Sequence, residues 1–584
     1  MESDRPHALA NGAAAAPRAA PAPRFPWLKA YPADIAWNET FKGRPLPALL
    51  EEAAASFGSR TCTNFLGKEL SFSRIQNLVD RVAEGLQKHG VKKGVTVGLL
   101  LPNCPSFVIF YFGILKAGGT VVNFNPLYTV SELAGQTKDS QIQLMVTLDL
   151  KALFPKVEAL LESGVLPRAV VCPFAKLLPA VKSVLFRVAK SGEIARWKSS
   201  PQAGKIIPYD DLIANGGKPQ PVAINPDTDV AVLQYTGGTT GTPKGAMLTH
   251  SNLTINVAQL QRWAPGMVKG DEQIMGVLPF FHVFGMTVVM NFAIAIGASM
   301  ILMPRFELVQ GLKLIRKLRP TLMPGVPTLY NALLTSPKLE KDHLVSLKFC
   351  FSGGAPLPVE VKRKFEAASG CALVEGYGLS ETSPVATANP LSGSNKVGSI
   401  GIPLPSTRLS IRSLEDPSKE MPLGENGELC IAGPQIMKGY WQRPKETADQ
   451  MVGEFFRTGD VGYMDAEGFT FIVDRMKDII ICSGFNVYPR RIEEAIYEFP
   501  AVQEVTVLGI PDNYRGEAPK AYVKLREGMD AKPSDIMAFL HDKLSKIEMP
   551  AEIEFRDELP KTMIGKLSKK ELRAEMKQAN ARKT

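Results

Sequence analysis

The chain of 584 residues lacks a cysteine framework. It has seven cysteines, an odd number, and no two of them form a C-x-x-C pair. They are Cys62, Cys104, Cys172, Cys350, Cys371, Cys430 and Cys482. Disulfide scaffolds and zinc sites need paired or regularly spaced cysteines, so neither is indicated. The sequence therefore favours a reducing, cytoplasmic compartment.

The N-terminus also lacks the continuous apolar core of a secretory signal. Residues 1–27 carry acids near the start and then an Ala/Pro run, which is not the pattern of a cleaved signal. We expect residues 1–44 to form a disordered leader. Residues 283–303 have no charge and are long enough to span a bilayer. Because Gly297 divides them, we predict a buried helix and a short strand that ends before Pro304.

The positive charge of the chain lacks the aromatic residues that would accompany it in a nucleic-acid site. The formal net charge is +10, and eight Lys or Arg lie within residues 560–584 against two acids. No aromatic residue lies among them, although single-strand binding surfaces use aromatic stacking. We therefore expect no nucleic-acid partner.

The pattern along the chain indicates more than one domain, since 584 residues exceed one compact core. A strand, a helix and a second strand follow one another over residues 95–124, and similar strands recur at 230–236, 298–303, 321–326 and 347–354. This alternation predicts a large α/β domain with mostly parallel sheets. Ligands of such domains bind beyond the carboxyl ends of the strands.

The pattern changes after Asp474 to short strands and helices, which predicts a small α+β domain. The charged segment 474–478, DRMKD, lies between two strand-like runs, as an exposed hinge would. We predict an N-terminal domain over residues 45–474 and a small, mobile C-terminal domain over 475–584.

Residues 235–250, YTGGTTGTPKGAMLTH, form the sharpest motif. Glycines let backbone N–H groups approach phosphate oxygens, the Thr hydroxyls add donors, and Lys244 supplies a cation. The motif lacks the G-x-x-x-x-G-K-[ST] spacing of a Walker A loop. We therefore predict a phosphate-binding loop of another family.

This loop resembles the signature of the adenylate-forming superfamily, which contains acyl-CoA synthetases, luciferases and nonribosomal adenylation domains. The resemblance runs from about residue 45 to the end and is greatest to bacterial long-chain fatty-acid CoA ligases. The other matching segments are LPFFHVFG at 278–285, SGGAPL at 352–357, EGYGLSETSP at 375–384, GELCIAGPQIMKGYW at 427–441, RTGDVG at 457–462, DRMKDIIICSGFNVYPRRIEE at 474–494 and RDELPKTMIGK at 556–566.

The resemblance implies a two-step ligase whose co-substrates are ATP and coenzyme A, with Mg²⁺ as the metal. A fatty acid and ATP give an acyl-adenylate and pyrophosphate, and coenzyme A then takes the acyl group. The implied catalytic residues are Lys566, Glu381 and Thr236, and the implied metal ligands are Thr240 and Glu381. The implied ATP- and AMP-binding residues are Thr236, Gly237, Gly238, Thr239, Thr240, Gly241, Lys244, Gly353, Gly354, Ala355, Gly376, Tyr377, Gly378, Thr382, Asp460 and Arg475.

The resemblance also implies that the small domain rotates between the two steps. The hinge would lie near Lys477. The implied coenzyme A residues are Ser483, Gly484 and Phe485, and the implied acyl pocket contains His282, Phe281 and Gly325. A buried histidine satisfied by the backbone is an equal alternative for His282.

Several alternatives stay open from the sequence. The acid could be medium-chain or aryl, the acceptor could be a carrier protein, and a nucleotide-binding sensor would be a non-enzyme. A homodimer is also left open. Residues 176–190 place apolar residues on one helical face and basic residues opposite. This pattern fits a helix on the inner face of a membrane and equally a surface helix packed on a sheet.

Overall fold

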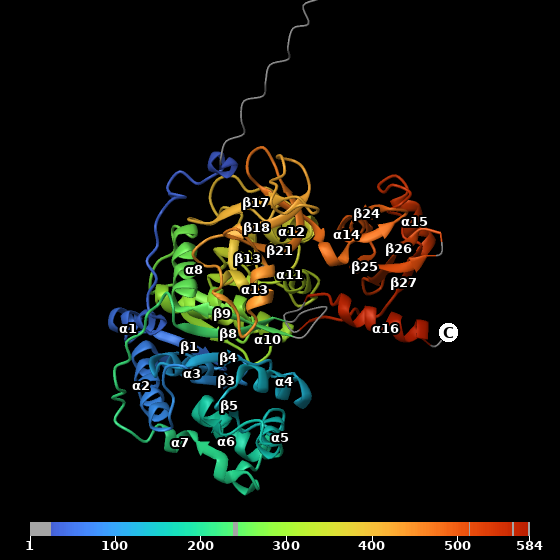
Figure 1. Ribbon diagram of the computed structural model, residues 1–584. Helices are drawn as coiled ribbons and strands as arrows, with labels where there is room; N and C mark the ends of the chain where they lie inside the picture. The colour runs from blue at the N-terminus through green and yellow to red at the C-terminus, as the bar shows by residue number, and fades with distance from the viewer. Residues whose placement is uncertain (1–24, 237–242, 341, 513, 563–565, 582–584) are drawn as a thin grey trace, which may run out of the picture.

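The computed structural model describes residues 25–236, 243–340, 342–512, 514–562 and 566–581. It contains two large sheets flanked by helices, a smaller antiparallel sheet, and a fourth sheet in the C-terminal part of the chain (Figure 1). This is the predicted α/β domain with mostly parallel sheets and a small α+β domain, and the predicted fold class is confirmed.

The first large sheet has the strand order β19-β9-β8-β4-β3-β5-β6-β7 and carries the phosphate-loop motif. Strands β3 to β8 pair in parallel, whereas β9 runs antiparallel to both β8 and β19. Its strands are β3 (Thr96–Leu99), β4 (Thr120–Asn123), β5 (Leu144–Leu148), β6 (Ala169–Cys172), β7 (Ile206–Pro208), β8 (Val230–Thr236), β9 (Lys244–Thr249) and β19 (Gly439–Tyr440). Its helices are α2 (Phe72–Lys88), α3 (Pro105–Lys116), α4 (Val130–Ser140), α5 (Phe154–Glu162), α6 (Ala180–Ala189) and α7 (Tyr209–Leu212).

The second large sheet has the order β16-β15-β14-β13-β12-β10-β11-β1-β2. Its strands are β1 (Thr61–Phe65), β2 (Lys68–Ser71), β10 (Gln273–Gly276), β11 (Ser299–Leu302), β12 (Leu322–Gly325), β13 (Phe349–Ser352), β14 (Ala372–Gly378), β15 (Val385–Ala388) and β16 (Ile402–Pro403). Its helices are α1 (Leu46–Phe57), α8 (His250–Trp263), α9 (Phe292–Ile296), α10 (Leu308–Leu318), α11 (Pro327–Leu334) and α12 (Val359–Ser369). The parallel strands β12, β13 and β14 all end at one edge, where the motif loops follow.

The antiparallel sheet contains β17 (Arg408–Arg412), β18 (Gly427–Ala432), β20 (Met451–Val452), β21 (Phe455–Met464) and β22 (Thr470–Arg475), with α13 (Pro444–Asp449) beside it. The fourth sheet contains β23 (Ile480–Cys482), β24 (Phe485–Val487), β25 (Val502–Asp512), β26 (Gly516–Leu525) and β27 (Glu552–Phe555), with α14 (Pro489–Tyr497), α15 (Pro533–Leu540) and α16 (Lys569–Ala581). This last sheet has hydrophobic clusters of its own, which begin at Ile480. A separate core supports the proposed boundary after Asp474.

The apolar segment 283–303 is buried inside the protein. A π-helix over Gly285–Asn291 continues into α9, Gly297 ends the helix with φ +69°, and β11 follows. All seven residues of the π-helix are buried. The predicted buried helix and strand are thus observed. Among the described residues, no helix is long and apolar enough to cross a membrane.

Part of the predicted leader differs from the expectation. Of residues 1–44, those from 25 onward are packed on the body of the protein. Trp27 is 2% exposed, and its ring lies 5.8 Å from that of Trp37. The Trp37 indole N–H donates to the Thr407 carbonyl at 2.9 Å. The prediction of disorder rested on the Ala/Pro-rich composition of the segment. The aromatic side chains of Trp27 and Trp37 instead bury large apolar areas against the protein, and composition alone does not indicate this contact.

Candidate active site

The phosphate-loop motif begins and ends on a β-hairpin. Thr236, the last residue of β8, pairs with Lys244, the first residue of β9. The Thr236 hydroxyl donates to the Lys244 carbonyl at 3.4 Å. The Lys244 ammonium lies 5.2 Å from the centre of the Tyr440 ring. The predicted phosphate-binding residues Gly237, Gly238, Thr239, Thr240 and Gly241 lie outside the described residues.

Glu381 lies next to this hairpin, in a short 3-10 helix over Ser380–Thr382. One of its carboxylate oxygens accepts a hydrogen bond from the Tyr440 hydroxyl at 2.7 Å, and the residue is only 8% exposed. Burial raises the pKa of this carboxyl above its usual value. A buried carboxylate needs a cationic partner, and oxygen ligands of this kind suit Mg²⁺. Glu381 therefore fits the predicted metal role.

A trio of side chains around the buried Asp460 links the second large sheet to the start of the small domain. Tyr377, near the end of β14, donates its hydroxyl proton to Asp460 at 2.5 Å. Arg475 faces Asp460 across the β21–β22 pair, with its Nε 2.9 Å from the carboxylate. Asp460 is 2% exposed. Its charge raises the pKa of Arg475, and burial raises that of Tyr377. The trio thus places an aromatic ring, a carboxylate and a guanidinium at one point of the candidate site.

The motif loops after β13 and β14 meet at the edge where these parallel strands end. Gly353, Gly354 and Ala355 follow β13, and residues 376–378 end β14. A side chain at Gly378 would place its Cβ 1.7 Å from the Pro384 carbonyl oxygen, so only glycine fits there. The Thr382 hydroxyl accepts from the Leu379 N–H at 2.8 Å and fixes the same turn. Parallel α/β sheets bind ligands at this edge.

Lys566 belongs to the loop between β27 and α16, yet it is electrostatically coupled to the N-terminal part. The loop is closed by the Thr562 N–H, which donates to the Lys566 carbonyl at 2.6 Å. Burial lowers the pKa of Lys566 to about 8, with the Arg475 charge lowering it further and Asp460 opposing both. The Lys566 pKa thus responds to the charges of Arg475 and Asp460.

The predicted acyl-pocket residues lie on neighbouring loops. The Gly353 N–H donates to the Gly325 carbonyl at 3.2 Å, which joins β12 to the loop after β13. Phe281 is held through its carbonyl, which accepts from the buried Gln234 amide at 3.0 Å. His282 accepts from the Phe284 N–H at 3.3 Å. Burial, and then the Lys566 charge, lower the pKa of His282 to about 3. The ring is therefore neutral near pH 7.

The predicted coenzyme A loop does not join this cluster. Ser483 and Gly484 form the β23–β24 turn with φ values of +52° and +82°, and Phe485 is 62% exposed. The Ser483 N–H donates to the Arg515 carbonyl within the small domain at 2.7 Å. Among the described residues, no hydrogen bond or ion pair joins these three to the trio at Asp460. A movement of the small domain would be needed to bring them to the same centre.

The predicted hinge lies at the junction where β22 meets the small domain. Lys477 is part of a 3-10 turn over Met476–Asp478. Beside it, Asp474 accepts from the backbone N–H of Arg490, which begins α14, at 2.9 Å. The Arg490 guanidinium donates to the Ile472 carbonyl at 2.8 Å. These bonds hold the two parts in the present arrangement, and a rotation about Lys477 would have to break them.

Sequence reasoning missed a second set of residues around the hairpin. Asp139 accepts from the Tyr235 hydroxyl at 2.6 Å and from the Arg443 guanidinium at 2.9 Å, and its carbonyl accepts from the Trp441 indole at 3.1 Å. Asp139 thus ties the strand before the phosphate loop to the segment after Tyr440. The GYW segment was part of a matched motif, but Asp139 is too distant in sequence for any pattern to indicate the contact.

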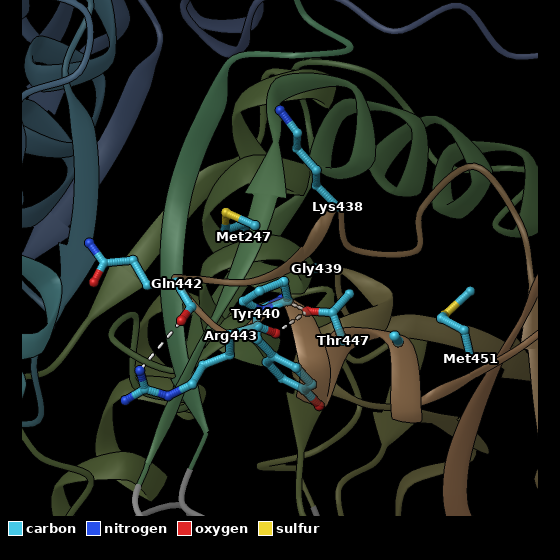
Figure 2. Close-up of a pocket in the computed structure, with 10 residues that line it drawn as sticks. Met247, Lys438, Gly439, Tyr440, Gln442, Arg443, Thr447 and Met451 are labelled. Atoms are coloured by element: carbon cyan, nitrogen blue, oxygen red, sulfur yellow. Dashed lines mark hydrogen bonds between the residues drawn. The ribbon is translucent and has the colours of Figure 1, made fainter.

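An open hollow of about 430 Å³ lies next to the site (Figure 2). It is lined by β19 and α13, including Lys438, Tyr440, Arg443 and Thr447. The Tyr440 N–H donates to the Thr447 hydroxyl at 2.9 Å on its wall. None of Tyr377, Asp460 or Lys566 lines it. The hollow is therefore a neighbour of the predicted adenylate site and not that site itself.

Family models match both parts of the chain. Residues 50–441 match that of the AMP-binding enzyme, and residues 491–566 match that of the AMP-binding enzyme C-terminal domain. The chain belongs to the AMP-binding enzyme family.

The most similar relatives agree in their names. The chain is 45% identical to a long-chain-fatty-acid–CoA ligase of Bacillus subtilis (strain 168), over 94% of this chain and 97% of that one. It is 35% identical to a protein of the same name from Escherichia coli O6:H1, over 94% and 98%. The crystal structure of ATP-bound MatB from Rhodopseudomonas palustris superposes with a TM-score of 0.80 at 29% identity, covering 92% of this chain and 99% of that one.

Proposed function

We propose that this protein is an ATP-dependent long-chain fatty acid:CoA ligase that acts in the cytoplasm. The observation that carries the proposal is the contact of the Tyr377 hydroxyl and the Arg475 guanidinium with the Asp460 carboxylate. The cation for the α-phosphate is Lys566, in the loop before α16. A protein that only bound nucleotide would have little use for it there. The names of the relatives support the long-chain acid and the coenzyme A acceptor.

The first step requires charge stabilisation and alignment. A fatty-acid carboxylate oxygen attacks the α-phosphate of ATP, a new P–O bond forms, and the bond to pyrophosphate breaks. Asp460 accepts hydrogen bonds from the ribose hydroxyls, Tyr377 stacks on the adenine, and Lys244 holds the outer phosphates. Lys566 bridges the carboxylate and the α-phosphate and stabilises the charge that develops between them. Glu381 would hold Mg²⁺, which neutralises phosphate charge when bound.

In the second step the sulfur of coenzyme A attacks the acyl carbonyl, a thioester forms, and AMP leaves. The small domain rotates about Lys477, which withdraws Lys566 and brings the turn at Gly484 to the adenylate. Since φ at Gly484 is +82° and the space around it is open, glycine allows a close backbone approach to the incoming thiol.

Replacing Gly484 with valine is expected to slow acyl-CoA formation by at least about tenfold, because a β-branched residue is strained at positive φ and bulky where coenzyme A would approach. Acyl-adenylate formation should be spared, so acyl-AMP accumulates. The measurement is the ratio of acyl-AMP to acyl-CoA by mass spectrometry. Gly164→Val is the matched control, because Gly164 also has a positive φ and open surroundings. An equal loss in both variants, or loss of adenylation at Gly484→Val, would refute this role.

The proposal is tested by AMP and pyrophosphate release across fatty acids from hexanoate to oleate and an aryl acid, with and without coenzyme A. We expect turnover to rise with chain length and to depend on coenzyme A. A preference for short or aryl acids would overturn the long-chain assignment. Acid-dependent release without any response to coenzyme A would indicate a carrier-protein acceptor. No release with any acid would leave a nucleotide-binding sensor.

A further inference from the structure

Helix α6 exposes its apolar face to solvent. Val181, Val184, Leu185 and Val188 are 72%, 62%, 58% and 74% exposed. Their spacing of i, i+3, i+4 and i+7 places all four on one stripe. No other helix among the described residues carries more than one large apolar side chain with comparable exposure. A contiguous apolar stripe of this kind marks a contact surface.

The helix is anchored by its other side. Phe186 packs on Phe174, with ring centres 5.0 Å apart, and the Lys182 ammonium donates to the Leu66 carbonyl at 2.7 Å. The sequence left open whether residues 176–190 pack their apolar face on a sheet. In the structure Pro179 divides the segment, Leu178 is buried, and the four residues of the stripe face away from the protein. The apolar face is therefore not part of the core.

The surroundings of the stripe are basic. Between residues 173 and 200 there is one acid, Glu193. The bases are Lys176, Lys182, Arg187, Lys190, Arg196 and Lys198. Lys176 forms an ion pair with Asp210, whereas Arg187 in α6 and Lys190 at its C-terminal end are exposed. An apolar stripe flanked by exposed bases complements a surface with an apolar interior and anionic headgroups.

We propose that α6 docks the protein on an anionic lipid bilayer, with the helix lying in the plane of the surface. The four apolar side chains enter the boundary of the acyl chains, and Arg187 and Lys190 contact headgroup phosphates. Figure 1 places α6 at the far end of the N-terminal part from the small domain, so docking leaves that domain free to rotate. Docking itself is independent of the ligase activity. Only its use, collecting fatty acids dissolved in the membrane, rests on the proposed function.

The test is co-sedimentation of the full chain, without substrates, with vesicles of phosphatidylcholine containing about one third phosphatidylglycerol. We expect the wild type to bind these vesicles and to release them as salt rises, because screening weakens the ionic part. A variant with Val181→Gln, Val184→Gln, Leu185→Gln and Val188→Gln should bind at least about tenfold more weakly. Glutamine is a good helix former, so α6 itself should persist. Val359→Gln, on the exposed face of α12, is the matched control and should bind like the wild type.

Three outcomes would overturn the proposal. The wild type could fail to bind the vesicles, or the fourfold variant could bind as well as the wild type. Alternatively, the wild type could be a dimer that the fourfold variant dissociates, in which case a second copy of this chain covers the stripe. Thermal unfolding and ATP-dependent activity on octanoate, a water-soluble acid, check that the fourfold variant is folded. If the ligase proposal fails, vesicle binding is still measured.

Discussion

Replacing Lys566 with alanine will abolish acyl-adenylate formation while sparing thioester formation from supplied acyl-adenylate. The pKa of this small-domain lysine is lowered by burial and by the Arg475 charge, and its own charge lowers the pKa of His282. Removing a preorganised group that stabilises developing charge typically costs about 100- to 1,000-fold in rate. We expect a loss of that size in acid-dependent exchange of pyrophosphate into ATP.

Lys561→Ala is the matched control for this experiment. Lys561 lies on the same loop, but its ammonium pairs with Glu504 of the small domain at 2.6 Å and not with the site. It should keep both half-reactions. Equal loss of adenylation and thioester formation in Lys566→Ala would contradict a role confined to the first step.

Replacing Asp460 with asparagine is expected to lower kcat/KM for ATP by about 100-fold, because the charged carboxylate makes stronger hydrogen bonds to the ribose hydroxyls than a neutral amide does. The variant keeps the shape of the side chain but loses the charge that faces Arg475 at 2.9 Å. It also replaces one of the two acceptor oxygens that face the ribose hydroxyls with an NH2 donor. Initial rates at varied ATP measure the effect.

The same variant should change the pH profile in a defined direction. Lys566 must be protonated to stabilise the transition state, and its pKa is about 8. Adenylation by the wild type should therefore fall as pH rises through about 8. Asp460 raises the pKa of Lys566, so in Asp460→Asn the fall should begin at a lower pH. If Asp460 had only a structural role, the rate would fall, but the pH at which adenylation declines would stay the same.

Glu272→Gln is the control for a buried carboxylate that pairs with a cation outside the site. Glu272 is 1% exposed and pairs with Lys348 at 3.1 Å. Its loss should lower stability but leave KM for ATP and the pH limb unchanged. If Asp460→Asn behaves in the same way as Glu272→Gln, Asp460 does not bind the nucleotide.

The elements around the site followed closely from the sequence. Strands with dense apolar runs, such as β3 and β8, were found where the pattern predicted them, because parallel strands buried on both faces read as continuous apolar segments. The end of the helix at Gly297 was also predictable from the sequence, since glycine commonly ends a helix in the left-handed conformation.

The contacts within the site could not be predicted from the sequence to the same degree. The motifs named Glu381 and Asp460, but Tyr440 and Asp139 act through hydrogen bonds to residues distant along the chain. A single sequence contains no signal for such pairs. For α6, periodicity identified an apolar face but could not tell whether that face points inward or outward. The packing of Phe186 decides it, because that side chain anchors the opposite side of the helix.

The most direct test of the central claim, one site that adenylates a long-chain acid and then transfers it to coenzyme A, is a two-stage single turnover. Enzyme in excess over oleate is mixed with ATP and Mg²⁺, quenched and analysed by mass spectrometry, and a parallel sample receives coenzyme A before quenching. The account predicts oleoyl-AMP in the first sample, replaced by oleoyl-CoA and AMP in the second. Absence of oleoyl-AMP, or oleoyl-AMP that persists after coenzyme A is added, would contradict it.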